Sequence, residues 1–418
     1  MNTNVTNMNR ETICRIPRLR FHEFSGEWVE KSFGKLYEKH NVKNDLSFGT
    51  DKIISVANMY FNRDAVVGDK GYLRTYNIFR LGDIAFEGHK SADYAYGRFV
   101  ENTIGDGIVS HVFDVYSPIS PDHCIEYWKY AINFEGIMRP ILEKSTIKST
   151  MMMNLIAKDF LKQIILVPPT IAEQQKIAEC LSAIDALMEA QEQKVGALKD
   201  RKQGLMQQLF PQPGEVTPRL RFPGFEGDWV EKKLGDVLVE RKESSIITEE
   251  LPQLSFTIAD GVIWPEDRKS NQRDFLMKDK DNKKFSVTRL HDIIYNPANV
   301  VHGAIHKNNL SDGVVSPIYK IFWTNENADF FNYLLKRPSF ISLLASRAEG
   351  TVTKLKTLKT EAFLDMSITF PINMSEQNII AGCFMTLDRL IKDESLKLDI
   401  LKVHKRGLMQ QLFPQPSK

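Results

Sequence analysis

The sequence has no excess of either charge, no long apolar run and few cysteines. Its 418 residues include 55 lysines and arginines against 53 aspartates and glutamates, so any surface that attracts nucleic acid must be local. No apolar run approaches the roughly 18 residues that a membrane-spanning helix needs. The N-terminus lacks the charged-then-apolar pattern of a secretion signal. We therefore expect no membrane association.

The four cysteines, Cys14, Cys124, Cys180 and Cys383, form no C-x-x-C pair. Two of them occupy matching positions of a repeat described below, where a small buried thiol is the ordinary explanation. This usage predicts a reducing, cytoplasmic location.

Motifs that carry catalysis are also missing. Neither a G-x-x-x-x-G-K-[ST] phosphate loop nor a G-x-G-x-x-G dinucleotide motif is present. His302 and His306 have the spacing of a zinc helix, but Gly303 stands where such a helix carries its glutamate base. Asn296–Asn299 only approaches the Asn-Pro-Pro-aromatic motif of adenine methyltransferases. No acidic-x-Lys pair follows the nuclease-like Pro121-Asp122 within the next thirty residues. We expect no metal site and no catalysis by this chain alone.

The most prominent feature present is a long internal repeat. The nine residues Leu205–Pro213 return unchanged at Leu408–Pro416, an offset of 203 residues. The same offset relates Phe160 to Phe363, Pro168 to Pro371, Glu173 to Glu376, Cys180 to Cys383, Asp185 to Asp388 and Lys202 to Lys405. A repeat of this length in unbroken register indicates one structural unit used twice.

Each copy contains apolar residues at alternating steps of three and four, the pattern of a helix that packs against another helix. The seam residues are Leu181, Ile184, Met188, Val195, Leu198, Leu205 and Leu209 in the first copy, and Phe384, Leu387, Ile391, Leu398, Leu401, Leu408 and Leu412 in the second. Polar interruptions also coincide, at Gln191 and Lys202 in one copy and at Glu394 and Lys405 in the other.

These helices are expected to start near Ala172 and Ser375 and to end before Pro211 and Pro414, where proline stops a helix. Each spans roughly 55 Å at about 1.5 Å per residue. They either lie separately on two domains or pack on each other. We favour an antiparallel coiled coil, because a pseudo-two-fold axis between the halves reverses one helix relative to the other.

A second repeated motif frames the domains. Pro17–Lys31 returns as Pro218–Lys232, with Arg-Leu-Arg-Phe and Trp-Val-Glu-Lys in both copies. In the middle of the chain it directly follows the Phe-Pro-Gln-Pro end of the first helix. The C-terminal Phe-Pro-Gln-Pro could lead into Pro17 in the same way, which predicts a circular arrangement with neighbouring termini. The alternative is a non-specific basic surface strand.

Two segments, residues 38–170 and 240–373, read as mixed α/β, with β-like runs at Leu81–Phe86 and Leu290–Tyr295. Asp106–Ser110 is echoed by Asp312–Ser316, and helices are expected near 125–133 and 328–335. The division predicted is an N-terminal segment (1–16), a first α/β domain (17–170), a first helical region (171–213), a second α/β domain (214–373) and a second helical region (374–418).

Residues able to contact phosphates and base edges cluster in the loops where the two halves differ. We predict DNA contacts in the first domain from Asn62, Arg63, Lys70, Arg74, Lys90, Arg98 and Lys148, and in the second from Arg268, Lys269, Asn271, Arg273, Asn299, Lys307, Arg347 and Lys354. Tyr72, Tyr76 and Asn308 belong to the same clusters. The mixture of arginine with asparagine suits base reading better than a purely electrostatic patch.

With these motifs assembled, the chain resembles the specificity subunit of type I restriction–modification systems. The resemblance is carried by Trp229–Asp236, by Pro168–Ile177 and by the Gly-Leu-Met-Gln-Gln-Leu-Phe-Pro helix ends. It implies two target-recognition domains alternating with two helical regions that pair as an antiparallel coiled coil, each domain reading one half of a bipartite site in double-stranded DNA. The second copy departs at Pro371–Asn378, which lacks the double proline.

The resemblance also implies two methyltransferase subunits and two restriction/translocase subunits as partners. S-adenosylmethionine, ATP and Mg²⁺ then belong to those partners, and no catalytic residue is implied for this chain. Two other interpretations remain open from the residues. One is a fused restriction–methylation enzyme, which the missing motifs argue against; the other is a protein-binding scaffold without DNA readout, which the Arg- and Asn-rich loops argue against.

Overall fold

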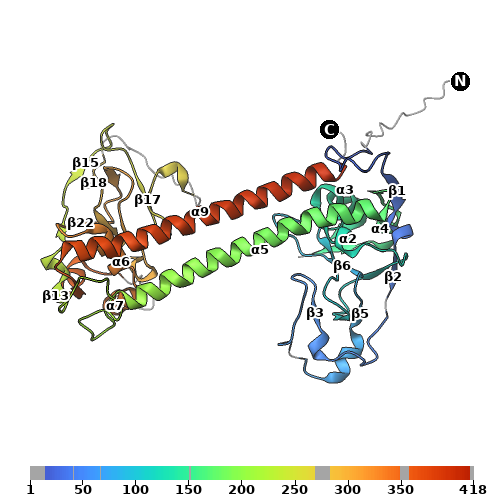
Figure 1. Cartoon of the computed structure of the whole chain (residues 1–418), viewed down its shortest axis with the longest axis horizontal. Helices are drawn as coiled ribbons and strands as arrows, with labels where there is room; N and C mark the ends of the chain where they lie inside the picture. The colour runs from blue at the N-terminus through green and yellow to red at the C-terminus, as the bar shows by residue number, and fades with distance from the viewer. Residues whose placement is uncertain are drawn as a thin grey trace. The chain divides into compact units, whose positions relative to one another are not determined.

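The computed structural model describes residues 15–414 except 41, 66, 150–151, 269–282 and 349–356. The chain forms two compact units, and both are built from discontinuous segments. Unit 1 contains residues 1–192 and 396–418, and unit 2 contains residues 193–395. Two long helices, α5 (Ile171–Gln208) and α9 (Met374–Leu412), each contribute one end to each unit (Figure 1).

Unit 1 is organised around a four-stranded antiparallel sheet, in the order β2 (Tyr37–His40), β9 (Val115–Pro118), β6 (Ile84–Glu87), β7 (Arg98–Glu101). Four two-stranded pairs surround it: β1 (Val29–Ser32) with β12 (Ile164–Val167), β3 (Ile54–Ser55) with β4 (Tyr60–Phe61), β5 (Asn77–Phe79) with β8 (Gly107–Val109), and β10 (Thr146–Lys148) with β11 (Met153–Leu155). The helices are α1 (Phe33–Leu36), α2 (Ile125–Ala131), α3 (Glu135–Ser145) and α4 (Ala157–Lys162), with the 3-10 turns η1 (Thr50–Lys52) and η2 (Lys70–Thr75).

Unit 2 repeats this plan. Its four-stranded sheet has the order β14 (Val239–Glu240), β22 (Lys320–Trp323), β19 (Ile293–Tyr295), β20 (Ile305–Lys307). Beside it lie β13 (Val230–Lys233) with β23 (Ser367–Phe370), β16 (Ser255–Thr257) with β17 (Gly261–Ile263), and the sheet β15 (Ser244–Ser245), β18 (Phe285–Thr288), β21 (Gly313–Val315). Its helices are α6 (Ala328–Leu335), α7 (Pro338–Arg347) and α8 (Thr360–Leu364), with the 3-10 turns η3 (Leu234–Asp236), η4 (Pro265–Asp267) and η6 (Val300–His302).

The Asp-Gly echo marks equivalent places, as the sequence predicts. Gly107 begins β8 and Gly313 begins β21. A Cβ atom on Gly107 would lie 2.5 Å from the carbonyl oxygen of Lys52, and one on Gly313 would lie 2.6 Å from that of Pro252. Because such an approach is too close for any side chain, glycine is required at both positions.

The predicted packing of the two long helices is confirmed. All fourteen seam residues are buried or half-buried. In unit 1, Lys405 of α9 pairs with Asp185 of α5 at 2.6 Å, and in unit 2, Lys202 of α5 pairs with Asp388 of α9 at 2.5 Å. The residue order of these pairs is antiparallel. Separate helices lying on two domains are therefore the wrong interpretation.

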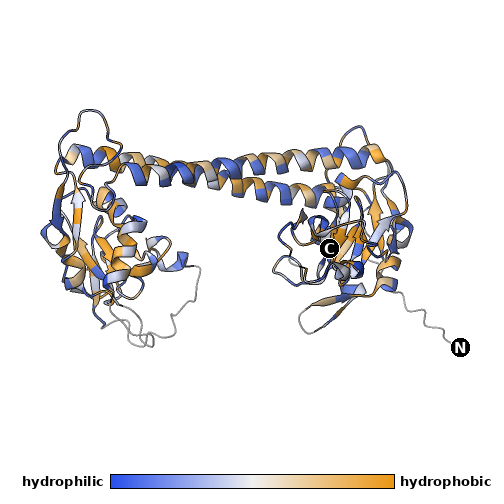
Figure 2. Cartoon of the chain, turned by 90° about the horizontal axis from the view of Figure 1, so that it is seen from below, coloured by the Kyte–Doolittle hydropathy of each residue, from blue (hydrophilic) through white to orange (hydrophobic). Residues whose placement is uncertain are grey.

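The circular relation between the halves is confirmed as well. In unit 1 the amide of Leu19 donates to the carbonyl of Gln411 at 3.0 Å, and in unit 2 the amide of Leu220 donates to that of Gln208 at 2.9 Å. The Phe-Pro end of each long helix is buried in a unit's core, since Phe413 packs edge-on against Trp28 and Phe210 against Trp229. Figure 2 shows apolar residues gathered inside each unit.

Candidate nucleic-acid interface

A buried carboxylate fixes the framing motif of unit 1 to the start of α5. Glu173 is 1% exposed. Its two oxygens accept from Nε and Nη2 of Arg20, both at 2.8 Å, and Oε1 also accepts from the Trp28 indole at 3.1 Å. Arg20 additionally donates to the carbonyl of Gly26. A bidentate arginine–carboxylate pair of this kind holds a defined orientation, so the helix start and the domain form one body.

Unit 2 repeats the arrangement with Glu376, Arg221 and Trp229. The carboxylate of Glu376 accepts from Nε and Nη2 of Arg221 at 2.7 and 2.8 Å and from the Trp229 indole at 3.2 Å. This carboxylate raises the pKa of Arg221. The Arg-Leu-Arg-Phe motif is therefore a structural clamp. The alternative interpretation, a non-specific basic surface strand, does not apply to the second arginine of the motif, which is Arg20 in unit 1 and Arg221 in unit 2.

A second clamp joins the helix pair to each domain. In unit 1, Asp185 accepts from Lys405 and from the Tyr130 hydroxyl of α2 at 2.7 Å, while the ammonium of Lys405 lies 5.1 Å from the Tyr130 ring centroid. Burial, with help from Asp185, raises the pKa of Tyr130. The phenol therefore stays protonated and donates. We name this group the Lys–Asp–Tyr clamp.

In unit 2 the Lys–Asp–Tyr clamp is made by Lys202, Asp388 and Tyr333 of α6. The Tyr333 hydroxyl donates to Asp388 at 2.7 Å, and Lys202 lies 5.4 Å from the ring centroid. Burial again raises the pKa of the tyrosine. The lysine and the aspartate of this clamp repeat at the 203-residue offset. The two tyrosines, Tyr130 and Tyr333, are related by the same offset, but they were not identified from the sequence.

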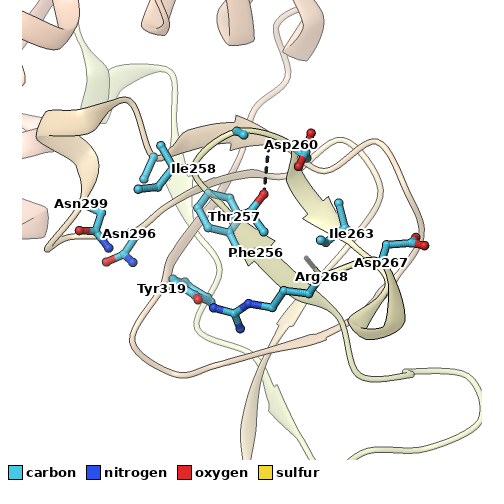
Figure 3. A pocket seen from close by; sticks show the side chains of 12 residues that line it. Phe256, Thr257, Ile258, Asp260, Ile263, Asp267, Arg268, Asn296, Asn299 and Tyr319 are labelled. Atoms are coloured by element: carbon cyan, nitrogen blue, oxygen red, sulfur yellow. Dashed lines mark hydrogen bonds between the residues drawn. The ribbon is translucent and has the colours of Figure 1, made fainter. Parts of the chain in front are cut away.

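A pocket of about 450 Å³ lies in the loop region of unit 2. It is bounded by the β16–β17 hairpin, by the turn after β19 and by η4 (Figure 3). Among its lining residues are Arg268, Asn296, Asn299 and Tyr319. Figure 3 shows the Arg268 guanidinium extended toward Tyr319, with the two asparagine amides beside each other. The pocket thus brings together Arg268 and Asn299, two of the residues predicted to contact DNA.

The lining of this pocket matches the chemistry of base edges. Arginine bridges the acceptors of guanine, asparagine pairs with the donor and acceptor of adenine, and carboxylates accept from cytosine. Asp260 and Asp267 also line the pocket and bring carboxylates to it. Burial raises the pKa of Tyr319, opposed by nearby Arg268, so its hydroxyl remains able to donate. The carboxylates make the pocket less suited to phosphate than to a base edge.

The walls of the pocket were missed by sequence reasoning. Phe256 packs on Tyr319 with ring centroids 5.1 Å apart, and these two rings are 63 residues apart in sequence. Asn296 begins the segment Asn296–Asn299, which partly resembles the Asn-Pro-Pro-aromatic motif of adenine methyltransferases. In the structure its side-chain oxygen accepts from the amide of Ala298 at 3.0 Å, so the motif is an Asx turn.

In unit 1 three of the predicted loop residues, Tyr72, Arg74 and Tyr76, lie on or directly after η2. The exposed ring of Tyr72 lies edge-on to Tyr76 and to His111, with centroids 5.9 and 6.4 Å apart. Arg74 is exposed on the same turn. Exposed aromatic rings beside an arginine can stack on bases or sugars. His111 was not among the predicted residues.

Two predicted DNA-contacting residues are placed where a direct contact is unfavourable. Lys307 is 5% exposed and pairs with Asp329 at 2.5 Å. Arg98 donates to Glu87 and to the carbonyl of Ala57, both at 2.7 Å. Both side chains stabilise their own unit. The sequence suggested polar loops at Arg98 and Lys307, whereas the structure has strand β7 at the first position and strand β20 at the second.

The remaining predicted residues are distributed over the surface. Asn62 is half-buried, and exposed side chains are found at Arg63, Lys90, Lys148 and Arg347. Lys269, Asn271, Arg273 and Lys354 lie outside the described residues, as does the side chain of Lys70. The DNA contacts of all these residues stay predictions.

Two further observations concern metals and membranes. Within the described part of the chain, no group of three or more His, Cys, Asp or Glu residues is placed to hold a metal ion. Both ring nitrogens of His306 have protein partners, the carbonyl of Ile258 and the ammonium of Lys336, each at 2.8 Å. No helix among the described residues is long and apolar enough to cross a membrane.

Residues 26–198 match the sequence model of the type I restriction modification DNA specificity domain. The fold is similar to that of the S subunit of a type I restriction-modification system from M. genitalium, with a TM-score of 0.55 and 13% identity over 96% of this chain and 100% of that one. A chain from a structure concerning complex assembly and conformational transition of the type I R-M system is similar at a TM-score of 0.54 and 12% identity, over 94% of this chain and 99% of that one. No curated protein matches the chain.

Proposed function

We propose that this chain, a member of the type I restriction–modification DNA specificity family, reads a bipartite DNA site with one recognition domain per half. Membership rests on the match of residues 26–198. The observation that carries the two-reader function is the repeated clamp architecture, which presents one domain scaffold twice with different loops. Two domains with the same frame and different loops read two different short sequences.

The repeated clamps also bear on spacing. Glu173 and Glu376 tie each domain to a long-helix start, and the Lys–Asp–Tyr clamps tie each domain to the helix pair. Neither α5 nor α9 is interrupted along its length. Domains held this way favour half-sites separated by a fixed length of unread DNA.

The partners follow from the same duplication. A pseudo-symmetric chain offers one docking surface twice, so two copies of a methyltransferase subunit are expected to bind, and two restriction/translocase subunits complete the complex. In this assignment S-adenosylmethionine, ATP and Mg²⁺ are bound by those partners, and the chain itself is a non-catalytic, cytoplasmic specificity subunit.

The test is to co-express the chain with its methyltransferase subunit and map methylated adenines in host DNA. A single motif of two short half-sites around a fixed gap is expected. Replacing residues 240–373 with the corresponding segment of another specificity chain should alter one half only. A stable complex that carries two methyltransferase copies yet methylates nothing would favour a scaffold instead.

A further inference from the structure

His306 does not line the pocket of unit 2 but contacts two of its lining residues, Ile258 and Phe256. It lies on β20 and is 6% exposed. Its Nε2 lies 2.8 Å from the carbonyl oxygen of Ile258, and its ring packs edge-on against Phe256 at 5.7 Å. A Cβ atom on Gly261, whose φ is +71°, would lie 2.8 Å from the His306 Cβ, so glycine permits this close approach. Two pocket-lining residues therefore depend on one histidine.

Lys336 holds this histidine in one tautomer. A carbonyl can only accept, so Nε2 of His306 carries the proton and Nδ1 is left as an acceptor. Nζ of Lys336, the residue that follows α6, lies 2.8 Å from that Nδ1 and donates to it. The hydrogen bond is charge-assisted, which makes it stronger than one between neutral groups.

The Lys336–His306 hydrogen bond connects the pocket to the helix pair. Tyr333 lies one helical turn before Lys336 and donates to Asp388 of α9, while Lys202 of α5 lies over its ring. A continuous series of contacts thus runs from the Lys–Asp–Tyr clamp through the end of α6 and His306 to the Ile258 carbonyl. All of these residues belong to unit 2.

The described residues of unit 1 that stand at the equivalent positions do not make this connection. Val100 occupies the place of His306, because Val100 pairs with Ala85 across β7 and β6 as His306 pairs with Ile294 across β20 and β19. Asn133 stands three residues after Tyr130, as Lys336 stands three after Tyr333. A valine cannot accept a hydrogen bond, so the two units differ here although their clamps are the same.

We infer that Lys336 and His306 are positioning residues for the half-site read by unit 2, holding the β16–β17 hairpin in its reading position from the helix pair. The inference rests on the proposed function. It means that Ile258 and Phe256 keep the positions that form the pocket only while His306 is neutral and Lys336 donates a hydrogen bond to that histidine. Recognition by unit 1 is independent of this connection.

The connection has a pH window. Burial lowers the pKa of Lys336 to about 8, with the charge of Lys202 adding to the effect and Asp388 opposing it. Burial and the charge of Lys336 lower the pKa of His306 to about 4, against the Ile258 carbonyl and Asp260. Between these values the lysine is charged and the histidine neutral. Above the upper value the lysine loses its charge and the hydrogen bond weakens.

The test uses the complex of the full chain with its methyltransferase subunit and three DNA duplexes. One duplex carries the whole site, and in each of the others one half-site is scrambled. The ratio of dissociation constants measures discrimination at each half. We expect Lys336→Met to reduce discrimination at the unit 2 half by about tenfold and to leave the unit 1 half unchanged. Asn133→Ala is the matched control in unit 1.

The pH profile separates positioning from a general structural role. Wild-type discrimination at the unit 2 half should fall as the pH rises from about 7 to about 9, while the unit 1 half stays constant. Lys336→Arg, whose charge persists, should retain discrimination at the higher pH. Equal loss at both halves, or full discrimination by Lys336→Met, would overturn the inference. A wild-type complex that distinguishes neither half would overturn the proposed function itself.

Discussion

The ammonium nitrogen of Lys202 lies 2.5 Å from Oδ1 of Asp388. Lys405 and Asp185 repeat this pair at 2.6 Å in the other unit. Each lysine interrupts the apolar seam of its helix and each aspartate also binds a tyrosine of the adjoining domain. The two lysines that break the seam therefore mark the points where the helix pair is joined to the domains.

The first prediction concerns the strength of this pair. A double-mutant cycle with Lys202→Met and Asp388→Asn should give a coupling free energy of about 0.5–1 kcal/mol, because the aspartate is partly exposed and solvent screens the pair. Urea unfolding of the four proteins measures it. The exposed pair of Lys402 with Glu192 is the control, with a coupling close to zero. Equal coupling in both cycles would contradict a joining role for the half-buried Lys202.

A second prediction addresses the buried carboxylates. Glu376→Gln should destabilise unit 2 by about 3 kcal/mol, because it leaves the Arg221 guanidinium without its buried partner. Hydrogen exchange of amides in α6 and β23 should accelerate, while amides of α2 and β12 keep their rates. Glu173→Gln should give the mirror result. Glu179→Gln, at an exposed position of α5, is the neutral control for both.

The architecture was predictable because repetition and periodicity are written directly in the sequence. The seam residues could be identified because a helix pair needs apolar side chains at alternating steps of three and four. Helix ends followed from Pro211 and Pro414, and α6 was expected with the bounds it has, Ala328–Leu335. The circular relation followed from the position of the framing motif after each Phe-Pro-Gln-Pro.

The recognition surface was much less predictable. Lys307 resembles a loop lysine in sequence, but β20 turns it toward Asp329. Phe256, Asn296 and Tyr319 meet only after β16, β19 and β22 are assembled, and no local pattern announces that meeting. Where a side chain points depends on strand register, and a shift of one residue reverses it. The sequence could therefore indicate which residues have the chemistry to contact DNA, but not which of them come together in one site.

A third prediction distinguishes base reading from phosphate contact. Arg268→Ala should lose about 1–3 kcal/mol of discrimination at one position of the unit 2 half-site, because a bidentate arginine reads a base edge. Lys90→Ala, an exposed lysine of unit 1, should weaken binding to all sequences alike and lower the salt slope by about one. Binding titrations against single-base variants at several salt concentrations measure both. Uniform weakening by Arg268→Ala would show that it contacts phosphate.

The fourth prediction is a pH dependence of stability. The pKa of Lys336 is about 8 in the folded chain against an ordinary value of 10.5, so the unfolded chain binds more protons between these values. Unit 2 should therefore become more stable as the pH rises through that interval. Lys336→Met should be more stable than wild type near neutral pH and lose this dependence. Thermal unfolding followed across the interval tests it, and a wild-type curve parallel to that of Lys336→Met would contradict the prediction.

The last prediction concerns the distance between half-sites. Removing seven residues from each long helix, around Gln193 in α5 and around Leu396 in α9, keeps the seam in phase because the apolar pattern repeats every seven residues. Each helix shortens by about 10 Å, which corresponds to about three base pairs of DNA. The half-sites should stay the same while the preferred gap between them changes.

Maps of methylated adenines for the wild type and the shortened chain measure this gap. Removing three residues from each helix is the matched control, since it takes the seam out of phase and should abolish the complex rather than retune it. A shortened chain that keeps both half-sites and the original gap would show that the helix pair does not set the spacing. The domains would then find their half-sites independently, and the uninterrupted helices would serve only to hold the partner subunits.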